Sequence, residues 1–198
     1  MPLTTEATTV ETDRVVFRLP AADPGVQSVR LWSEVPVAQR EFERTDDGWL
    51  LEIPHPGAHR VEYLFELSDG LDTVLVTDPT NPLLVEGVFG DHSWLPMPGY
   101  RPPAWLDAPR VEGRATPVAF DTADGSVTGE LWTPADTWRG TPLPLLISHD
   151  GTQMARYGRL TDFVAAAIAD HTLPPLRLLL LDPGADRTAR YAANARYA

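Results

Sequence analysis

Two hydrophobic patterns divide the chain, and the first one covers its N-terminal part. Between Arg14 and Val76, short runs rich in β-branched and aromatic residues alternate with turn sequences such as Asp46-Asp47-Gly48. The strands that this pattern predicts are Arg14–Leu19, Ser28–Trp32, Trp49–Ile53, Val61–Leu67 and Thr73–Val76. Short strands at this spacing favour an antiparallel arrangement in two layers. We therefore predict a small β-sandwich domain over residues 1–77.

The stretch 78–110 has no regular hydrophobic period. Its prolines exclude a helix or an interior strand, because proline lacks the backbone N–H that both structures use. These prolines are Pro79, Pro82, Pro96, Pro98, Pro102, Pro103 and Pro109. Apolar residues such as Phe89 and Trp105 occur between them and need burial. We predict a connector over 78–110 that lies against both domains rather than swinging freely.

Residues 111–198 follow a different pattern. Continuous apolar runs flank a segment with helical i, i+3, i+4 spacing, which is typical of a βαβ crossover in a sheet covered on both faces. The predicted elements are a hairpin (Ala115–Phe120 with Ser126–Trp132), a strand (Leu143–Ser148), a helix (Tyr157–Asp170), a strand (Leu176–Leu181) and a last helix from about Asp186. The second half is therefore predicted to be an α/β domain.

Composition and charge exclude several classes of function. The 198 residues carry a formal net charge of −12 and contain no lysine, which argues against a nucleic-acid partner or an anionic membrane surface. No cysteine is present, so disulfides, a thiolate nucleophile and cysteine metal sites are excluded. The first eleven residues lack the basic start and apolar core of a secretory signal, so we expect a cytoplasmic protein. The longest apolar run is too short for a membrane helix.

The histidines offer no obvious metal site. His55 and His59 are four residues apart, but Pro56-Gly57 between them excludes the helix that would bring both to one ion. The adjacent pair Asp91-His92 has the chemistry of an acid–base couple, yet it lies in the proline-rich stretch and is more often a local hydrogen-bonded pair. We therefore expect no metal and no cofactor.

Four stretches of the sequence, in this order, resemble the enterochelin (ferric enterobactin) esterase family and its relatives in the esterase D group. They are Asp78-Pro-Thr-Asn-Pro82, Gly90–Tyr100 together with Trp105, Leu145–Gly151, and Asp182 through Arg187 to Asn194. The resemblance implies an immunoglobulin-like (early-set) β-sandwich over 1–77, the connector, and the first part of an α/β-hydrolase domain over 111–198. Tyr63 and the Asp-Pro-x-Asn-Pro turn are typical of the early-set module.

The same resemblance implies hydrolysis of a carboxylic ester, such as a ferric siderophore trilactone, through a serine acyl-enzyme. In α/β-hydrolases the serine lies in a G-x-S-x-G elbow, and the acid and the histidine follow it along the chain. None of the six serines of this sequence lies in such a motif. We therefore expect the elbow and the catalytic histidine to lie beyond Ala198, and we expect this chain alone to be inactive.

Two candidate site regions follow from the resemblance. The loop after Leu143–Ser148 is where an α/β-hydrolase supplies one oxyanion N–H, which marks Asp150 and Gly151 as backbone oxyanion residues. The alternative is a plain turn in which Asp150 caps local N–H groups.

The second region follows the strand Leu176–Leu181 and marks Arg187 and Asn194 as substrate contacts. Relatives carry a glutamate where this sequence has Arg190, which weakens that assignment. The alternative is an arginine that is solvated or paired with Asp182 or Asp186.

A different class of function stays open: a noncatalytic module in which the sandwich binds a glycan or a protein. Against it, a half-built hydrolase sheet would expose Leu143–Ile147 and Leu176–Leu181 to water. Oligomerisation through that exposed sheet edge is a third alternative.

Overall fold

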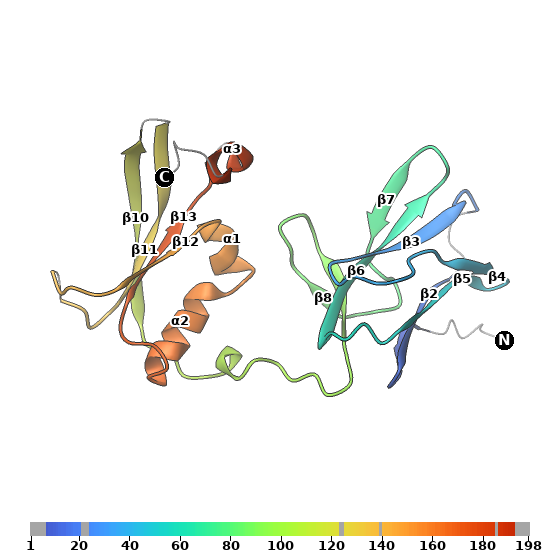
Figure 1. Cartoon of the computed structure of the whole chain (residues 1–198), viewed down its shortest axis with the longest axis horizontal. Coiled ribbons are helices and arrows are strands. Elements are labelled where there is room, and N and C mark those ends of the chain that lie inside the picture. The colour runs from blue at the N-terminus through green and yellow to red at the C-terminus, as the bar shows by residue number, and fades with distance from the viewer. Residues whose placement is uncertain (1–6, 21–23, 123–124, 139, 185, 193–198) are drawn as a thin grey trace. The chain divides into compact units, whose positions relative to one another are not determined.

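The computed structural model describes residues 7–20, 24–122, 125–138, 140–184 and 186–192. The chain divides into two compact units, Met1–Arg101 and Pro102–Ala198. Figure 1 shows strands in both units and the three labelled helices in the second. Each unit is described below by itself.

The first unit consists of two antiparallel sheets. One has the strand order β1-β2-β5-β4, and the other has the order β3-β6-β9-β8 with β7 paired beside β9 on β6. The strands are β1 (Thr9–Val10), β2 (Arg14–Pro20), β3 (Ser28–Ser33), β4 (Glu43–Thr45), β5 (Gly48–Pro54), β6 (Arg60–Ser68), β7 (Thr73–Val76), β8 (Leu84–Val85) and β9 (His92–Pro96). The five strands predicted for this region from the sequence are all present.

Both sheets contribute to one closed core. Alternate residues of β6 point inward, and Val61, Tyr63 and Phe65 are fully buried. Phe17 of β2 meets Tyr63 edge-on, with ring centroids 5.0 Å apart. Trp49, Leu51 and Ile53 of β5 and Leu95 of β9 belong to the same cluster. Burial of these side chains is the main source of stability of this unit.

A buried hydrogen-bond network joins Tyr63 to the Asp-Pro-Thr-Asn-Pro turn. The Tyr63 hydroxyl donates to Asp78 Oδ2 at 2.7 Å and accepts from Asn81 Nδ2 at 3.1 Å. Asp78 is 2% exposed and also accepts from Thr80, while its own N–H donates to the Ser93 hydroxyl at 2.8 Å. Burial and the neighbouring carboxylate raise the pKa of Tyr63 far above its usual value. The turn that the sequence singled out is therefore hydrogen-bonded to Tyr63, a residue of the hydrophobic core.

The expectation that residues 78–110 contain no interior strand is wrong. Strand β9 lies between β6 and β8, and Leu95 and Met97 are buried. Proline is tolerated here because Pro96 occupies the last position of its strand. Phe89, expected to need burial, is 99% exposed.

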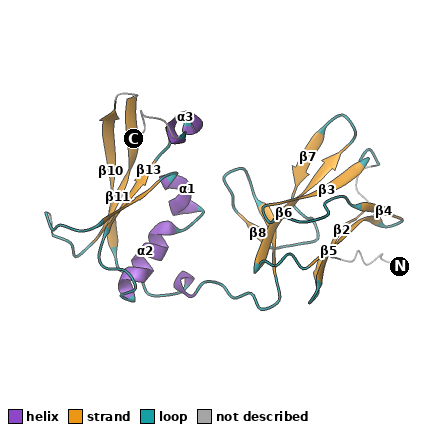
Figure 2. Cartoon of the chain, viewed as in Figure 1, coloured by secondary structure: helices purple, strands orange, loops and turns teal. Residues whose placement is uncertain are grey.

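The second unit contains one mixed sheet with helices beside it (Figure 2). The strand order is β10-β11-β13-β12; β10, β11 and β13 are antiparallel neighbours, and β12 and β13 are parallel. The elements are the 3₁₀ helix η1 (Ala104–Leu106), β10 (Gly113–Thr122), β11 (Gly125–Pro134), β12 (Leu145–Ser148), α1 (Gly151–Arg156), α2 (Leu160–Ala169), β13 (Arg177–Leu181) and α3 (Arg187–Tyr191). The predicted hairpin and crossover are confirmed.

The core of this unit is smaller and lies between the sheet and α2. Trp132 of β11 and Leu178 and Leu180 of β13 pack with Val164 and Ile168. Trp105 of η1 meets Phe163 of α2 edge-on, with centroids 5.6 Å apart. This cluster covers the middle of the sheet but not its β12 edge.

The two central strands differ in exposure. In β12, Leu145, Leu146 and Ile147 are 52%, 40% and 50% exposed, because β13 is the only neighbour that β12 has among the described strands. In β13, Leu178, Leu179 and Leu180 are buried between β11 and β12. The expected exposure is therefore correct for the first strand and wrong for the second. Within the described part of the chain, no helix has the length and apolarity to cross a membrane.

Candidate functional site

The candidate site is built on the loop that joins β12 to α1. Asp150 adopts a left-handed backbone conformation, with φ 53° and ψ 42°, at the N-cap of α1. Aspartate tolerates this region better than most residues. The Asp150 carbonyl accepts the first helical bond from Met154 N–H at 2.8 Å. The chain therefore turns sharply from strand into helix within two residues.

Gly151 begins α1 and lies against the main chain of β13. It is buried, and an added Cβ would overlap the backbone atoms of Leu180 and Leu181. Only glycine allows the helix to start this close to the sheet. The position of Gly151 is therefore fixed by packing rather than by a special backbone angle.

Arg187 of α3 holds the Asp150 side chain. Its Nε donates to Oδ1 at 2.8 Å and its Nη2 donates to Oδ2 at 2.7 Å, which is a bidentate pair. Hydrogen bonding to Arg187 lowers the pKa of Asp150. Arg187 is 62% exposed and Asp150 is 24% exposed, so the pair lies at the surface. Asp150 is thus an ion-pair partner of Arg187, not a side-chain cap.

Tyr191 completes this arrangement and was not anticipated from the sequence. Its hydroxyl accepts from the Asp150 backbone N–H at 3.1 Å, and its ring lies 4.9 Å from the His149 ring. The Arg187 guanidinium carbon is 5.4 Å from the Tyr191 centroid. The available signal was the i, i+4 spacing, which places Arg187 and Tyr191 on one face of α3.

Asp182 holds Thr152, the second residue of α1, through two hydrogen bonds. Its Oδ1 accepts from the Thr152 N–H at 3.3 Å and from the Thr152 hydroxyl at 2.5 Å. Asp182 directly follows β13, so the ends of the two parallel strands are tied together. The carboxyl ends of parallel strands are the usual place for ligands in α/β sheets.

The structure brings three of the four predicted site residues together. Asp150, Gly151 and Arg187 lie at one sheet edge, and Arg187 pairs with Asp150, a partner that the sequence did not indicate. Asn194 lies outside the described residues. Ser148, the serine nearest this loop, donates its hydroxyl to the His149 carbonyl at 3.1 Å. The site therefore combines the backbone of the β12–α1 loop with the cationic Arg187 side chain of α3.

Sequence comparison gives no relative. No protein-family model matches the sequence, and no curated protein matches it.

Comparison with solved structures gives clear neighbours. The enterobactin esterase from Shigella flexneri, crystallised in the presence of 2,3-dihydroxy-N-benzoyl-serine, is 18% identical with a TM-score of 0.68, over 97% of this chain and 58% of that one. The ferric enterobactin esterase from Salmonella typhimurium is 18% identical with a TM-score of 0.71, over 96% of this chain and 60% of that one. The present chain therefore spans less than two thirds of these proteins.

These neighbours confirm the resemblance found in the sequence at the level of the fold. Nearly all of this chain matches, and the match fits an N-terminal part of the esterases.

Proposed function

We propose that this chain is the N-terminal part of a serine carboxylic-ester hydrolase. The first unit is then an immunoglobulin-like accessory sandwich, and the second is the first part of an α/β-hydrolase domain. The observation that carries the proposal is the loop at Gly151, where the third strand of the second unit passes directly into a helix pressed against β13. The fold shared with two enterobactin esterases supports it.

In this proposal the Gly151 backbone N–H stabilises the developing oxyanion. In α/β-hydrolases one such donor comes from the loop after the third strand and the other from the residue after the nucleophile. The Asp150 N–H already donates to Tyr191 and the Thr152 N–H to Asp182, which favours the intervening Gly151 as the donor. Asp150 then serves to hold the loop through its pair with Arg187.

The proposed substrate is a ferric siderophore trilactone or a related ester. The enterobactin esterase from Shigella flexneri was crystallised in the presence of enterobactin, of 2,3-dihydroxy-N-benzoyl-serine and of 2,3-dihydroxy-N-benzoyl-glycine. Arg187 uses two of its five N–H donors on Asp150, so others are available for an oxygen-rich substrate. Asn194 follows on the same segment of chain as a second proposed contact.

Activity is proposed for the longer protein and not for these 198 residues, because they contain no G-x-S-x-G motif. The test is to sequence the coding region past the Ala198 codon and to express both the 198-residue chain and the longest product. A fluorophosphonate probe should label only the longer product, at the serine of an elbow. A stop codon directly after Ala198 would remove the esterase proposal. Labelling of the short chain would instead contradict the proposal that these 198 residues are inactive alone.

A noncatalytic binding module is the second candidate. The core of the first unit favours it, since its cluster of buried hydrophobic residues is formed by residues of this unit alone. The exposed leucines and isoleucine of β12 weigh against a module made of the whole chain. Size-exclusion chromatography separates the two: a stable monomer of the 198-residue chain supports the module, and association supports the esterase fragment.

A further inference from the structure

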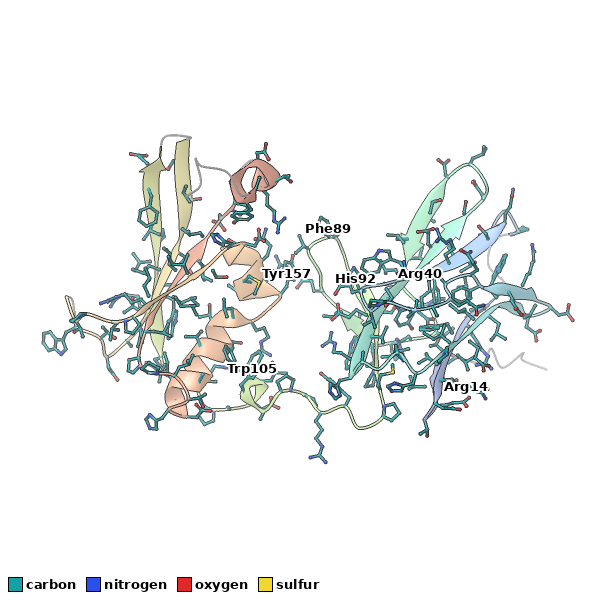
Figure 3. All side chains as sticks on the ribbon, viewed as in Figure 1. Arg14, Arg40, Phe89, His92, Trp105 and Tyr157 are labelled. Carbon is teal, nitrogen blue, oxygen red and sulfur yellow. The ribbon has the colours of Figure 1, made fainter. Side chains whose placement is uncertain are left out.

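The outer face of the sheet β3-β6-β9-β8 gathers three metal-ligating side chains. Glu62 lies on β6 between the inward-pointing Val61 and Tyr63, so it faces away from the core. Glu34 follows the last residue of β3 on one side of β6, and His92 begins β9 on the other. The cluster therefore draws on three adjacent segments of the first unit (His92 is labelled in Figure 3).

The distances suit a single ion. One ligating atom from each of Glu34, Glu62 and His92 can be chosen so that all three lie within 4.8 Å of one another. His92 Nδ1 is 3.7 Å from Glu62 Oε2. Two donors bound at about 2.1 Å to a tetrahedral zinc ion lie about 3.4 Å apart, so this pair needs only a small adjustment. Glu34 is exposed and can swing to close the third distance.

The histidine is the feature that points to a ligand. The side chain of His92 is 12% exposed, and its Nδ1 atom is buried without a hydrogen-bond partner among the described residues. A buried polar atom left without a partner costs free energy, and native proteins seldom keep one. A metal ion between Nδ1 and the carboxylates would satisfy it.

The surroundings hold both inner ligands in place. Arg60 pairs with Oε1 of Glu62, which leaves Oε2 facing the histidine. The Trp32 ring lies 4.9 Å from the His92 ring and restricts its rotation. Such outer contacts are what orient ligands in metal sites.

We propose that Glu34, Glu62 and His92 form a binding site for a divalent transition-metal ion, with Zn²⁺ the best match. Imidazole together with carboxylates suits Zn²⁺, whereas Ca²⁺ and Mg²⁺ take oxygen ligands. The site lies in the first unit and is independent of the proposed esterase chemistry. Because the ion would link the end of β3 to β6 and β9, binding stabilises the folded sandwich.

The test is isothermal titration of ZnCl₂ into the 198-residue chain and its variants. The wild type should bind one ion, His92→Gln and Glu62→Gln should each weaken binding by at least about tenfold, and Glu34→Gln should weaken it less because this side chain is exposed. His59→Gln is the matched control, since His59 is an exposed histidine of the same unit, and should bind as the wild type does. Calcium binding, measured by titration with CaCl₂, should be the same in every variant as in the wild type.

Thermal unfolding gives a second readout. Zinc should raise the Tm of the wild type and of His59→Gln but not that of His92→Gln. Absence of zinc binding to the folded wild type would overturn the site, and so would equal binding by wild type, His92→Gln and Glu62→Gln. If His92→Gln does not fold, Glu62→Gln alone decides, because this substitution keeps the size of a side chain that is 28% exposed.

Discussion

The two units of this chain have nearly equal lengths and contain sheets of similar size, yet only the first encloses its core between two sheets. In the first unit, both sheets contribute to the same buried cluster, and a buried hydrogen-bond network at Asp78 holds its Tyr63. In the second unit, one sheet packs on α2 while Leu145 and Ile147 of the edge strand β12 are about half exposed. A hydrogen-bonded sheet is thus not sufficient for an independent domain, because its edge strands and its apolar faces also need to be covered.

Separating the units should give the largest effect. Residues 1–101 should unfold cooperatively as a monomer, because their buried cluster lies between two sheets of the same unit. Residues 102–198 should associate or lack a sharp transition, because β12 keeps its apolar edge. Circular dichroism melts with size-exclusion chromatography measure both. A monomeric, cooperatively unfolding second unit would show that its open edge is tolerated, and the contrast between the units would fail.

Removing the buried carboxylate of the first unit should give the next largest effect. Asp78→Ala leaves the Tyr63 hydroxyl and the Thr80 groups without their buried acceptor. We expect a loss of about 3 kcal/mol in the free energy of unfolding, measured by urea titration. Asp91→Ala is the matched control at an exposed aspartate, and should change the same quantity by less than about 0.5 kcal/mol. Equal losses in the free energy of unfolding at the two positions would mean that the hydrogen-bond network at Asp78 does not stabilise the core.

The exposed ion pair of the second unit should give the smallest effect, visible mainly as a change in pH dependence. Arg187 lowers the pKa of Asp150, so the stabilisation from this pair is complete above the unfolded pKa of about 3.9 and is lost as the pH falls through the lower folded value. In Arg187→Ala the pKa of Asp150 should rise towards its ordinary value. Carboxyl ¹³C NMR titration of Asp150 measures it.

The control for this titration is Arg114→Ala, an exposed arginine on β10. It should leave the pKa of Asp150 unchanged, whereas an unchanged pKa in Arg187→Ala would show that the bidentate pair does not form in solution.

Periodicity predicted the long elements of both units, because alternation and apolar runs follow from which faces are buried. The strand predicted at Val61–Leu67 is β6, Arg60–Ser68, and the helix predicted at Tyr157–Asp170 is α2, Leu160–Ala169. Short elements were missed. Helix α1 starts at Gly151, a poor helix former whose place is set by contact with Leu180, far away in the sequence.

The side-chain clusters were the least predictable part. Family resemblance indicated the loop at Asp150 and Gly151, but not that Arg187 and Tyr191 would both contact Asp150. The group Glu34, Glu62 and His92 has no local spacing to find, because pairing across three strands brings these residues together. Such clusters follow from strand order and register, which no short motif contains.

The strand order of the second unit also determines when β12 can join the sheet during synthesis. Strand β12 is made before β13, yet β13 lies between it and β11, so β12 has no place in the sheet until β13 leaves the ribosome. Roughly thirty residues separate them, which corresponds to a few seconds at about 5–20 residues per second. For that interval Leu145–Ser148 is an apolar strand with two unpaired edges. The nascent chain is therefore most open to aggregation, or to capture by a chaperone, while α1 and α2 are being made.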